Sequence, residues 1–290
     1  MLREGQNNFE TPRVIITGGT EGLGREITRI FSGKIDTRVA ICARTPERIA
    51  DLKKELGETL ITESLDLIDQ EKARHFIRSS VDELGGLDLL ILNAAVTGIE
   101  RKDLTQEENS RRAEYAGRVN FDSNVEILNE AEKDLAISRG SLVFFTSRFT
   151  QMEIPPKSVA AYAESKKKME EFLKDFSRQE KNKDIFVVII EPGRLRTRIP
   201  AEARDFAPDE VSELVKKEEP NWKDPALAGR VVAEIVRTRC DFDPVTRQFT
   251  RPINSGEKVS LTEDYFRWAE EFHNQKSEKS FNPNNPSSDN

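Results

Sequence analysis

The chain has 290 residues, of which 36% are hydrophobic and 33% charged, and 45 Lys and Arg residues against 52 Asp and Glu residues give a net charge of −7. This length suits one large α/β domain or two small ones, and the acidic balance gives no overall attraction to nucleic acid. The sequence has no apolar run of membrane-spanning length and its polar N-terminus is unlike a signal or transit peptide, so we expect a cytoplasmic protein without a membrane partner. Cys42 and Cys240 are too few for a disulfide framework or a metal cluster, and we expect no metal.

A strand, a glycine-rich turn and a helix follow one another near the N-terminus. Arg13–Thr17 is a β-branched run typical of a buried parallel strand. It leads into GGTEGLG at 18–24 and then into a helical segment with Ile27, Ile30 and Phe31. Glycines let the backbone approach a pyrophosphate closely, and the helix N-terminus offers N–H donors. The turn therefore predicts a dinucleotide site; a glycine-rich turn without a ligand is the alternative.

The second strand, Arg38–Cys42, ends at Ala43 and Arg44. In dinucleotide folds this strand end faces the adenosine ribose, where an acid binds the 2′-hydroxyl and an arginine suits a 2′-phosphate. Because Arg44 is present without an acid, NADP(H) is favoured over NAD(H). A solvated arginine that opens the next loop is the alternative.

Helices and strands continue to alternate after this point. We expect helices over 46–56 and 69–84 and strands over 59–62 and 87–92. This alternation predicts a Rossmann-like α/β fold, a doubly wound parallel sheet of about seven strands with helices on both faces. Asp66, after the third strand, either contacts an adenine or serves as a turn residue.

Tyr162 and Lys166 lie in a predicted helix that follows a buried strand over 141–147. Residues four apart share one helical face, and an ammonium near a phenol favours the phenolate and lowers the pKa of the tyrosine. The pair is therefore a candidate proton donor and acceptor. A chance tyrosine–lysine spacing is the alternative reading of the pair taken alone.

The remaining segments complete one Rossmann-fold domain over 13–273, between a polar leader at 1–12 and a tail at 274–290 that we expect to be disordered. The segments we expect, in chain order, are helices over 103–139 broken near Gly117, a strand over 185–190, a substrate lid over 194–224, a helix over 225–239, an edge strand over 248–253 and a helix over 261–272.

Taken together, these stretches resemble the short-chain dehydrogenase/reductase family in its single-domain branch, over roughly residues 13 to 200. The matching motifs are TGGTEGLG at 17–24, Leu65-Asp66, Asn93-Ala94-Ala95, Asn120, Ser147, Tyr162-x-x-x-Lys166, and Pro192-Gly193 followed by Thr197.

The resemblance implies an NADP(H)-dependent carbonyl reductase or alcohol dehydrogenase acting on a small molecule. Tyr162 would be the general acid and base, and Lys166 would lower its pKa and hold the ribose hydroxyls on the nicotinamide side. Ser147 would stabilise charge on the substrate oxygen. Asn120 would hold a water that links Lys166 to solvent.

The same resemblance implies a cofactor site in which the glycine turn carries the pyrophosphate, Arg44 the 2′-phosphate and Asp66 the adenine. Asn93 would lie on the adenosine side, whereas Gly193 and Thr197 would border the nicotinamide. The full set of expected cofactor-binding residues is Gly18, Thr20, Glu21, Gly22, Leu23, Gly24, Arg44, Asp66, Leu67, Asn93, Ala94, Ala95, Tyr162, Lys166, Pro192, Gly193 and Thr197.

Three departures from the family pattern bear on these expectations. Ala95 stands where the family usually has glycine. Ser147 precedes Tyr162 by fifteen residues, further than is usual, so either the loop 148–160 is longer or Phe149 takes the serine's place; we expect the longer loop. The C-terminal third does not match the family's common ending, so the resemblance names no substrate.

Two arginine groups hint at an anionic substrate; surface pairing with Glu and Asp is the alternative. They are Arg194, Arg196 and Arg198, and Arg101, Arg111, Arg112 and Arg118. An epimerase or dehydratase of the same family, or a non-catalytic NADP(H)-sensing regulator, are the alternative functions. By family analogy the chain would form a homodimer or homotetramer through the helices carrying Asn120 and Tyr162.

Overall fold

The computed structural model describes residues 12–33 and 37–280, without the side chains of residues 210 and 273–280. The expected polar leader lies outside the described residues except for Pro12. The same holds for 281–290 of the expected tail.

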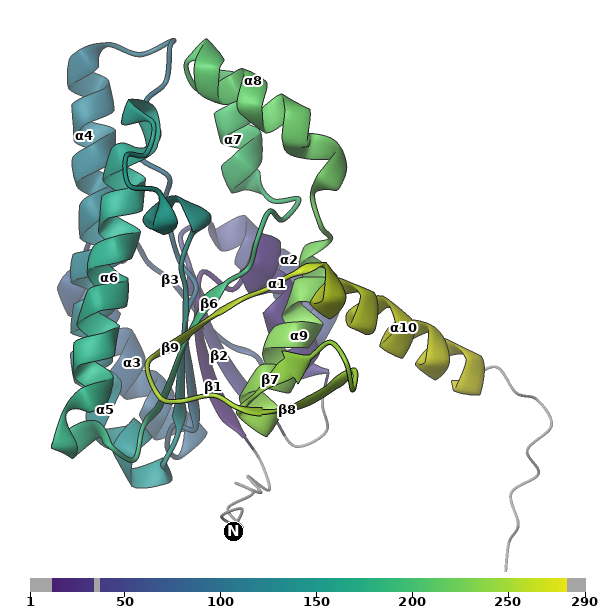
Figure 1. Ribbon diagram of the computed structural model, residues 1–290. Coiled ribbons are helices and arrows are strands. Elements are labelled where there is room, and N and C mark those ends of the chain that lie inside the picture. Colours follow the sequence, from purple (N-terminus) through teal and green to yellow (C-terminus); the bar gives the residue numbers. More distant parts are fainter. Residues whose placement is uncertain (1–11, 34–36, 281–290) are drawn as a thin grey trace, which may run out of the picture.

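A parallel sheet of seven strands forms the centre of the fold, as predicted, in the order β3-β2-β1-β4-β5-β6-β9 (Figure 1). The strands are β1 (Arg13–Thr17), β2 (Arg38–Ala43), β3 (Ile61–Ser64), β4 (Leu89–Leu92), β5 (Ser141–Phe145), β6 (Phe186–Glu191) and β9 (Glu257–Ser260). The order reverses between β1 and β4, where the crossovers leave a crevice beyond the carboxyl ends of the strands.

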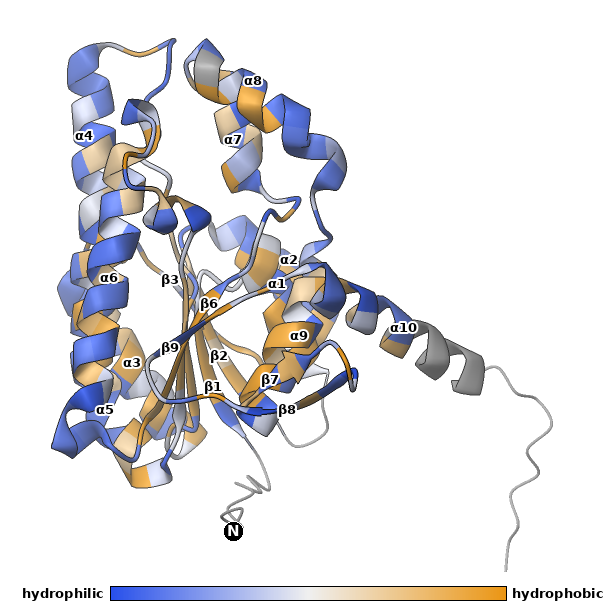
Figure 2. Ribbon diagram, viewed as in Figure 1, coloured by the Kyte–Doolittle hydropathy of each residue, from blue (hydrophilic) through white to orange (hydrophobic). Residues whose placement is uncertain are grey.

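Both faces of the sheet are buried, since successive side chains of a strand point to opposite faces. Val14 and Ile16 of β1 pack in one core cluster with residues of α1, α9 and α10. Ile15 packs in the other with residues of α3, α5 and α6. Apolar residues accordingly concentrate on the strands, while the outer faces of α4 and α6 are hydrophilic (Figure 2).

Ten helices surround this sheet within the described residues. They are α1 (Gly22–Ser32), α2 (Pro46–Leu56), α3 (Gln70–Leu84), α4 (Gln106–Gly117), α5 (Ser123–Ser138), α6 (Ala160–Arg178), α7 (Arg198–Phe206), α8 (Asp209–Glu218), α9 (Pro225–Thr238) and α10 (Glu263–Ser280). The predicted break near Gly117 is a π-helical turn, Arg118–Asp122, between α4 and α5. None of the helices in the described part of the chain has the length and apolar content to cross a membrane.

The segment 194–224 contains two helices where the sequence indicated a weakly periodic lid. Prolines interrupt the pattern, but Pro200 lies in the first turn of α7, where a proline is tolerated. Ala203, Ala207 and Val211 from this segment bury against Ile99 and Val159 of the body. The lid helices therefore have an apolar contact of their own, and Figure 1 shows them above the carboxyl ends of the strands, beside α4.

The C-terminal region differs from its prediction in three ways. The expected edge strand is β8 (Gln248–Pro252), which pairs antiparallel with β7 (Cys240–Asp243) in a separate sheet. The seventh strand of the main sheet is β9, which the sequence did not indicate because Val259 is its one buried residue. The terminal helix expected over 261–272 is α10, which begins at Glu263 and continues to Ser280.

Candidate active site

A cavity of about 450 Å³ opens at the carboxyl ends of β1, β2, β4, β5 and β6, under the lid helices. Nearly every site residue expected from the sequence lines it; the exceptions are Gly24 and Asn120. The expected residues that line it are Gly18, Thr20, Glu21, Gly22, Leu23, Arg44, Asp66, Leu67, Asn93, Ala94, Ala95, Ser147, Tyr162, Lys166, Pro192, Gly193 and Thr197.

The glycine-rich turn forms one wall of the cavity. Gly18 and Gly22 have φ of 68° and 51°, a region that favours glycine. A Cβ on Gly24 would lie 2.3 Å from both Asn93 Nδ2 and Gly18 O, so this glycine allows close packing beneath the turn. Glu21 is the N-cap of α1 but makes no side-chain cap bond, and its carboxylate pairs with Arg48.

Asn93 braces this turn from the end of β4. Its Nδ2 donates to Thr17 O and to Gly18 O, each at 3.0 Å. Thr17 Oγ1 accepts from the backbone N–H groups of Asn93 at 3.1 Å and of Ala94 at 3.0 Å. The Asn93 side chain thus fixes the carboxyl ends of β1 and β4 against each other, a structural role that its motif alone did not indicate.

Tyr115 of α4 joins two expected cofactor residues and was missed by the sequence reasoning. Arg44 Nη1 donates to the Tyr115 hydroxyl at 2.9 Å, and that hydroxyl donates to Asp66 Oδ2 at 2.7 Å. Burial, followed by the hydrogen bond to Asp66, raises the pKa of Tyr115. No sequence signal marks these two contacts, because Tyr115 lies 71 positions after Arg44 and 49 positions after Asp66.

Tyr162 and Lys166 are both buried, with 7% and 2% of their surfaces exposed. Burial raises the pKa of Tyr162 to about 12, although a side-chain hydrogen bond with Ser147 lowers it. Burial lowers the pKa of Lys166 to about 7, and the charge of Glu170 opposes this. Lys166 Nζ donates to Phe145 O at 2.8 Å and lies 5.9 Å from the centre of the Tyr162 ring.

The expectation that Lys166 lowers the pKa of the phenol is therefore wrong for the chain alone. The ammonium is directed to the Phe145 carbonyl, and desolvation of Tyr162 dominates its pKa. At neutral pH the tyrosine carries its proton, so it can donate a hydrogen bond or a proton to an oxygen in the cavity.

The Ser147 side chain, rather than Phe149, is the neighbour that lowers the pKa of Tyr162, which supports the longer loop. The additional length is taken up by two 3₁₀ turns, Arg148–Gln151 and Lys157–Val159, ahead of α6. Phe149 also lines the cavity.

Asn120 is fully buried in the π-helical turn and both ends of its amide have protein partners. Oδ1 accepts from Val96 N at 3.0 Å, and Nδ2 donates to Val96 O at 2.9 Å and to Ser165 Oγ at 3.1 Å. The side chain thus holds the loop after β4 against α6. Both N–H groups of the amide are used, so a water held by Asn120 would have to donate to Oδ1 or to the backbone carbonyl, which already accept from Val96 and Asn124.

The arginines of the two sequence groups mostly pair with carboxylates. Arg112 bonds to Glu202 and Arg194 to Glu218, both carboxylates of the lid segment. Others pair at the surface: Arg101 with Asp103, Arg111 with Glu107 and Arg198 with Glu21. Arg148, which the sequence reasoning did not select, also reaches Glu218, at 3.6 Å.

We expect Lys166→Met to stabilise the fold at pH 7. The pKa of Lys166 is lower in the folded chain than in the unfolded chain, so between about pH 7 and 10.5 the unfolded state binds the extra proton and the stability contribution of Lys166 rises with pH. The variant should gain on the order of 3 kcal/mol at pH 7 and less at pH 9.5 in urea unfolding. Lys167→Met, on the exposed side of α6, is the control and should change little. A Lys166→Met protein less stable than wild type at pH 7 would contradict this.

Comparison with known proteins finds relatives of similar sequence. A family model described as short chain dehydrogenase matches residues 12–207. An uncharacterized oxidoreductase of Mycobacterium tuberculosis is 26% identical over 201 residues, which cover 66% of this chain and 76% of that protein. The 11-beta-hydroxysteroid dehydrogenase-like 3 of Arabidopsis thaliana is 30% identical over 189 residues, 63% of this chain and 59% of that protein.

Solved structures share the fold at lower identity. A short chain dehydrogenase/reductase from Saccharomyces cerevisiae superposes with a TM-score of 0.72 at 20% identity, covering 87% of this chain and 97% of that one. A short chain dehydrogenase from Burkholderia cenocepacia in complex with NADP has a TM-score of 0.68 at 21% identity, covering 86% and 96%. With the family model matching more than half of its length, the chain belongs to the short-chain dehydrogenase/reductase family of oxidoreductases.

Proposed function

We propose that this protein is an NADP(H)-dependent oxidoreductase that interconverts a carbonyl compound and a secondary alcohol. The observation that carries the proposal is that Tyr162 and Ser147, whose interaction lowers the pKa of the phenol, line the same cavity as the glycine-rich turn. Two hydroxyls that meet at a cavity wall can bind one substrate oxygen between them.

The residues of the cavity fit a nicotinamide dinucleotide. The amides that begin α1 have no side-chain cap, and a helix N-terminus offers such amides to an anion. Gly18 and Gly22 line the cavity, and glycines let the backbone approach a pyrophosphate closely. The Lys166 ammonium donates once to Phe145 O and has two further donors for ribose hydroxyls. The bound cofactor would supply the hydride chemistry.

The chain's own residues would supply the proton and the orientation. Because the pKa of Tyr162 is about 12, its phenol is protonated at neutral pH and would donate to the carbonyl oxygen during reduction. Ser147 would hydrogen-bond the same oxygen and stabilise negative charge that develops there. Lys166, with its Nζ bonded to the Phe145 carbonyl, would hold the ribose hydroxyls on the nicotinamide side.

Arg44 supports NADP(H) over NAD(H) in this proposal. It is exposed at the cavity edge after β2, and its guanidinium already bonds to Tyr115, which also holds Asp66. A guanidinium held in this way is prepared to bind a 2′-phosphate.

The lining under the lid favours a substrate with an apolar body. The apolar side chains there are Ile99, Phe149, Val159, Val211, Leu214, Val215 and Trp222. An anionic group on the substrate also has support, because Arg112 Nε and Arg194 Nη2 are buried without a hydrogen-bond partner among the described residues. Two ketones that differ only in one carboxylate group would test for the anionic group: the carboxylate should lower KM if the arginines bind it.

Location and assembly belong to the same proposal. The free thiols of Cys42 and Cys240, which suit a reducing compartment, support a cytoplasmic enzyme. Family analogy supports a homodimer or homotetramer. Light scattering on the purified chain measures the oligomeric state directly.

We expect Tyr162→Phe to lower kcat for NADPH oxidation with ketone and aldehyde substrates by about 10²- to 10⁴-fold, because the variant lacks the proton donor. Binding of NADPH should change little. The control is Tyr265→Phe, which alters a buried tyrosine of α10. Full turnover by Tyr162→Phe would exclude the proposed acid, whereas NADPH binding without turnover by wild type would indicate a regulator.

We expect Arg44→Ala to raise the Kd for NADPH about tenfold, since it removes a charge-assisted bond to the 2′-phosphate. The Kd for NADH should stay within a factor of about two. Titration calorimetry with both cofactors measures this difference. An equal loss for NADH and NADPH would mean that Arg44 does not recognise the phosphate.

A further inference from the structure

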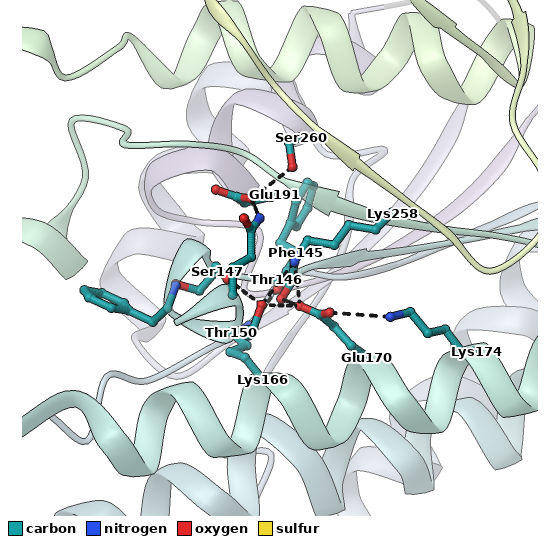
Figure 3. A network of polar contacts seen from close by, with 12 residues as sticks. Phe145, Thr146, Ser147, Thr150, Lys166, Glu170, Lys174, Glu191, Lys258 and Ser260 are labelled. Atoms are coloured by element: carbon teal, nitrogen blue, oxygen red, sulfur yellow. Dashed lines mark hydrogen bonds and ion pairs between the residues drawn. The ribbon is translucent and has the colours of Figure 1, made fainter. Parts of the chain in front are cut away.

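A buried polar cluster lies directly behind the turn that carries Ser147 (Figure 3). Its centre is Glu170 of α6, one helical turn after Lys166 and 6% exposed. The other members come from the end of β5, from the 3₁₀ turn Arg148–Gln151 and from β9, which lies far along the chain. Glu170 acts on the pKa of Lys166, but none of these groups is assigned a contact with substrate or cofactor above.

Glu170 Oε1 receives contacts from three side chains at once. The Thr146 hydroxyl bonds to it, the Thr150 hydroxyl lies 2.6 Å away, and Lys258 Nζ donates to it at 3.2 Å. A buried carboxylate is costly unless it is paired and hydrogen-bonded. This one satisfies both conditions, and Lys258, with a side chain 19% exposed, is its charge partner from β9.

These contacts hold the backbone on both sides of Ser147. Thr146 precedes the serine directly. Thr150 follows it, its hydroxyl lies 2.8 Å from Ser147 O, and its N–H donates to the same carbonyl at 3.0 Å. Lys258 Nζ also donates to Thr150 Oγ1 at 3.1 Å.

Strand β9 holds the far end of the same turn through a second contact. Ser260 Oγ donates to Glu191 Oε2 at 2.9 Å, and the Gln151 side chain bonds to that same carboxylate oxygen. The Ser147 turn is thus fixed by α6 and by two residues of β9.

We propose that Glu170 and Lys258, acting through Thr150, are positioning residues that hold the Ser147 hydroxyl at Tyr162. The effect of these residues on catalysis rests on the proposed function, whereas their contacts with the Ser147 turn do not. The loop between Ser147 and Tyr162 is longer than the family usually has, so sequence neighbours alone constrain the serine less. A displacement of about 1 Å of a catalytic group can cost up to about a hundredfold in rate, which gives the cluster its importance.

Thr150→Val is the sharpest test, because it removes one hydroxyl, keeps the volume and leaves the Glu170–Lys258 pair in place. Thr150→Ser restores the hydroxyl and should behave as wild type. The first readout is amide hydrogen exchange of 147–152, measured by mass spectrometry on the full chain without substrate. We expect exchange about tenfold faster in Thr150→Val and in Lys258→Met. Lys174→Met, whose ammonium reaches Glu170 Oε2 from the outer side of α6 at 3.9 Å, is the matched control and should not change it.

The second readout is a double-mutant cycle with Ser147→Ala. We expect Thr150→Val to lower kcat about tenfold in the wild-type background, with KM for NADPH unchanged, and less than about twofold in the Ser147→Ala background. A general structural role would give the same loss in both backgrounds and would overturn the proposal.

The two readouts separate the possible failures. Unchanged exchange at 147–152 in both Thr150→Val and Lys258→Met overturns the positioning role whatever the kinetics show. Faster exchange in a protein that turns over no carbonyl substrate supports the positioning role and contradicts the proposed function instead.

Discussion

The burial of the Lys166 ammonium is the constraint on which this site depends. A charged lysine with 2% exposure is unfavourable in a folded protein, and here its Nζ has the Phe145 carbonyl as hydrogen-bond acceptor and Glu170 as the opposing charge. The same desolvation that lowers the pKa of Lys166 raises the pKa of Tyr162. Burial thus moves the two pKa values apart, to about 12 and about 7, so that Tyr162 is the group that keeps its proton at neutral pH.

Burial of these groups is made possible by contacts that tie distant strands together at their carboxyl ends. Asn93 braces the glycine turn of β1, Asn120 holds the loop after β4 to α6, and β9 contributes Lys258 and Ser260 behind the Ser147 turn. The C-terminal part of the chain, which has no match to the family's common ending, therefore supports the site as well as covering it.

Much of this architecture could be predicted from the sequence because buried parallel strands leave a local signal. Runs such as Val14–Ile16 are apolar on both faces, and the glycine turn is specific in its setting between strand and helix. The parts that could not be predicted depend on contacts between distant residues. Tyr115 reaches Asp66 across 49 positions, Lys258 reaches Glu170 across 88, and the strand that carries Lys258 has one buried residue. The lowered pKa expected for Tyr162 was wrong because desolvation outweighs a lysine whose ammonium points to a carbonyl.

Tracing the transferred hydrogen tests the central claim most directly. NADPH that carries deuterium at both hydrogens of the nicotinamide C4 would be incubated with the protein and a set of ketones, and the product alcohol analysed by mass spectrometry. The account predicts one deuterium on the carbinol carbon, in an amount equal to the NADPH oxidised. A product whose new carbon-bound hydrogen comes from water instead of NADPH would contradict the account. So would the absence of any alcohol when NADPH is bound.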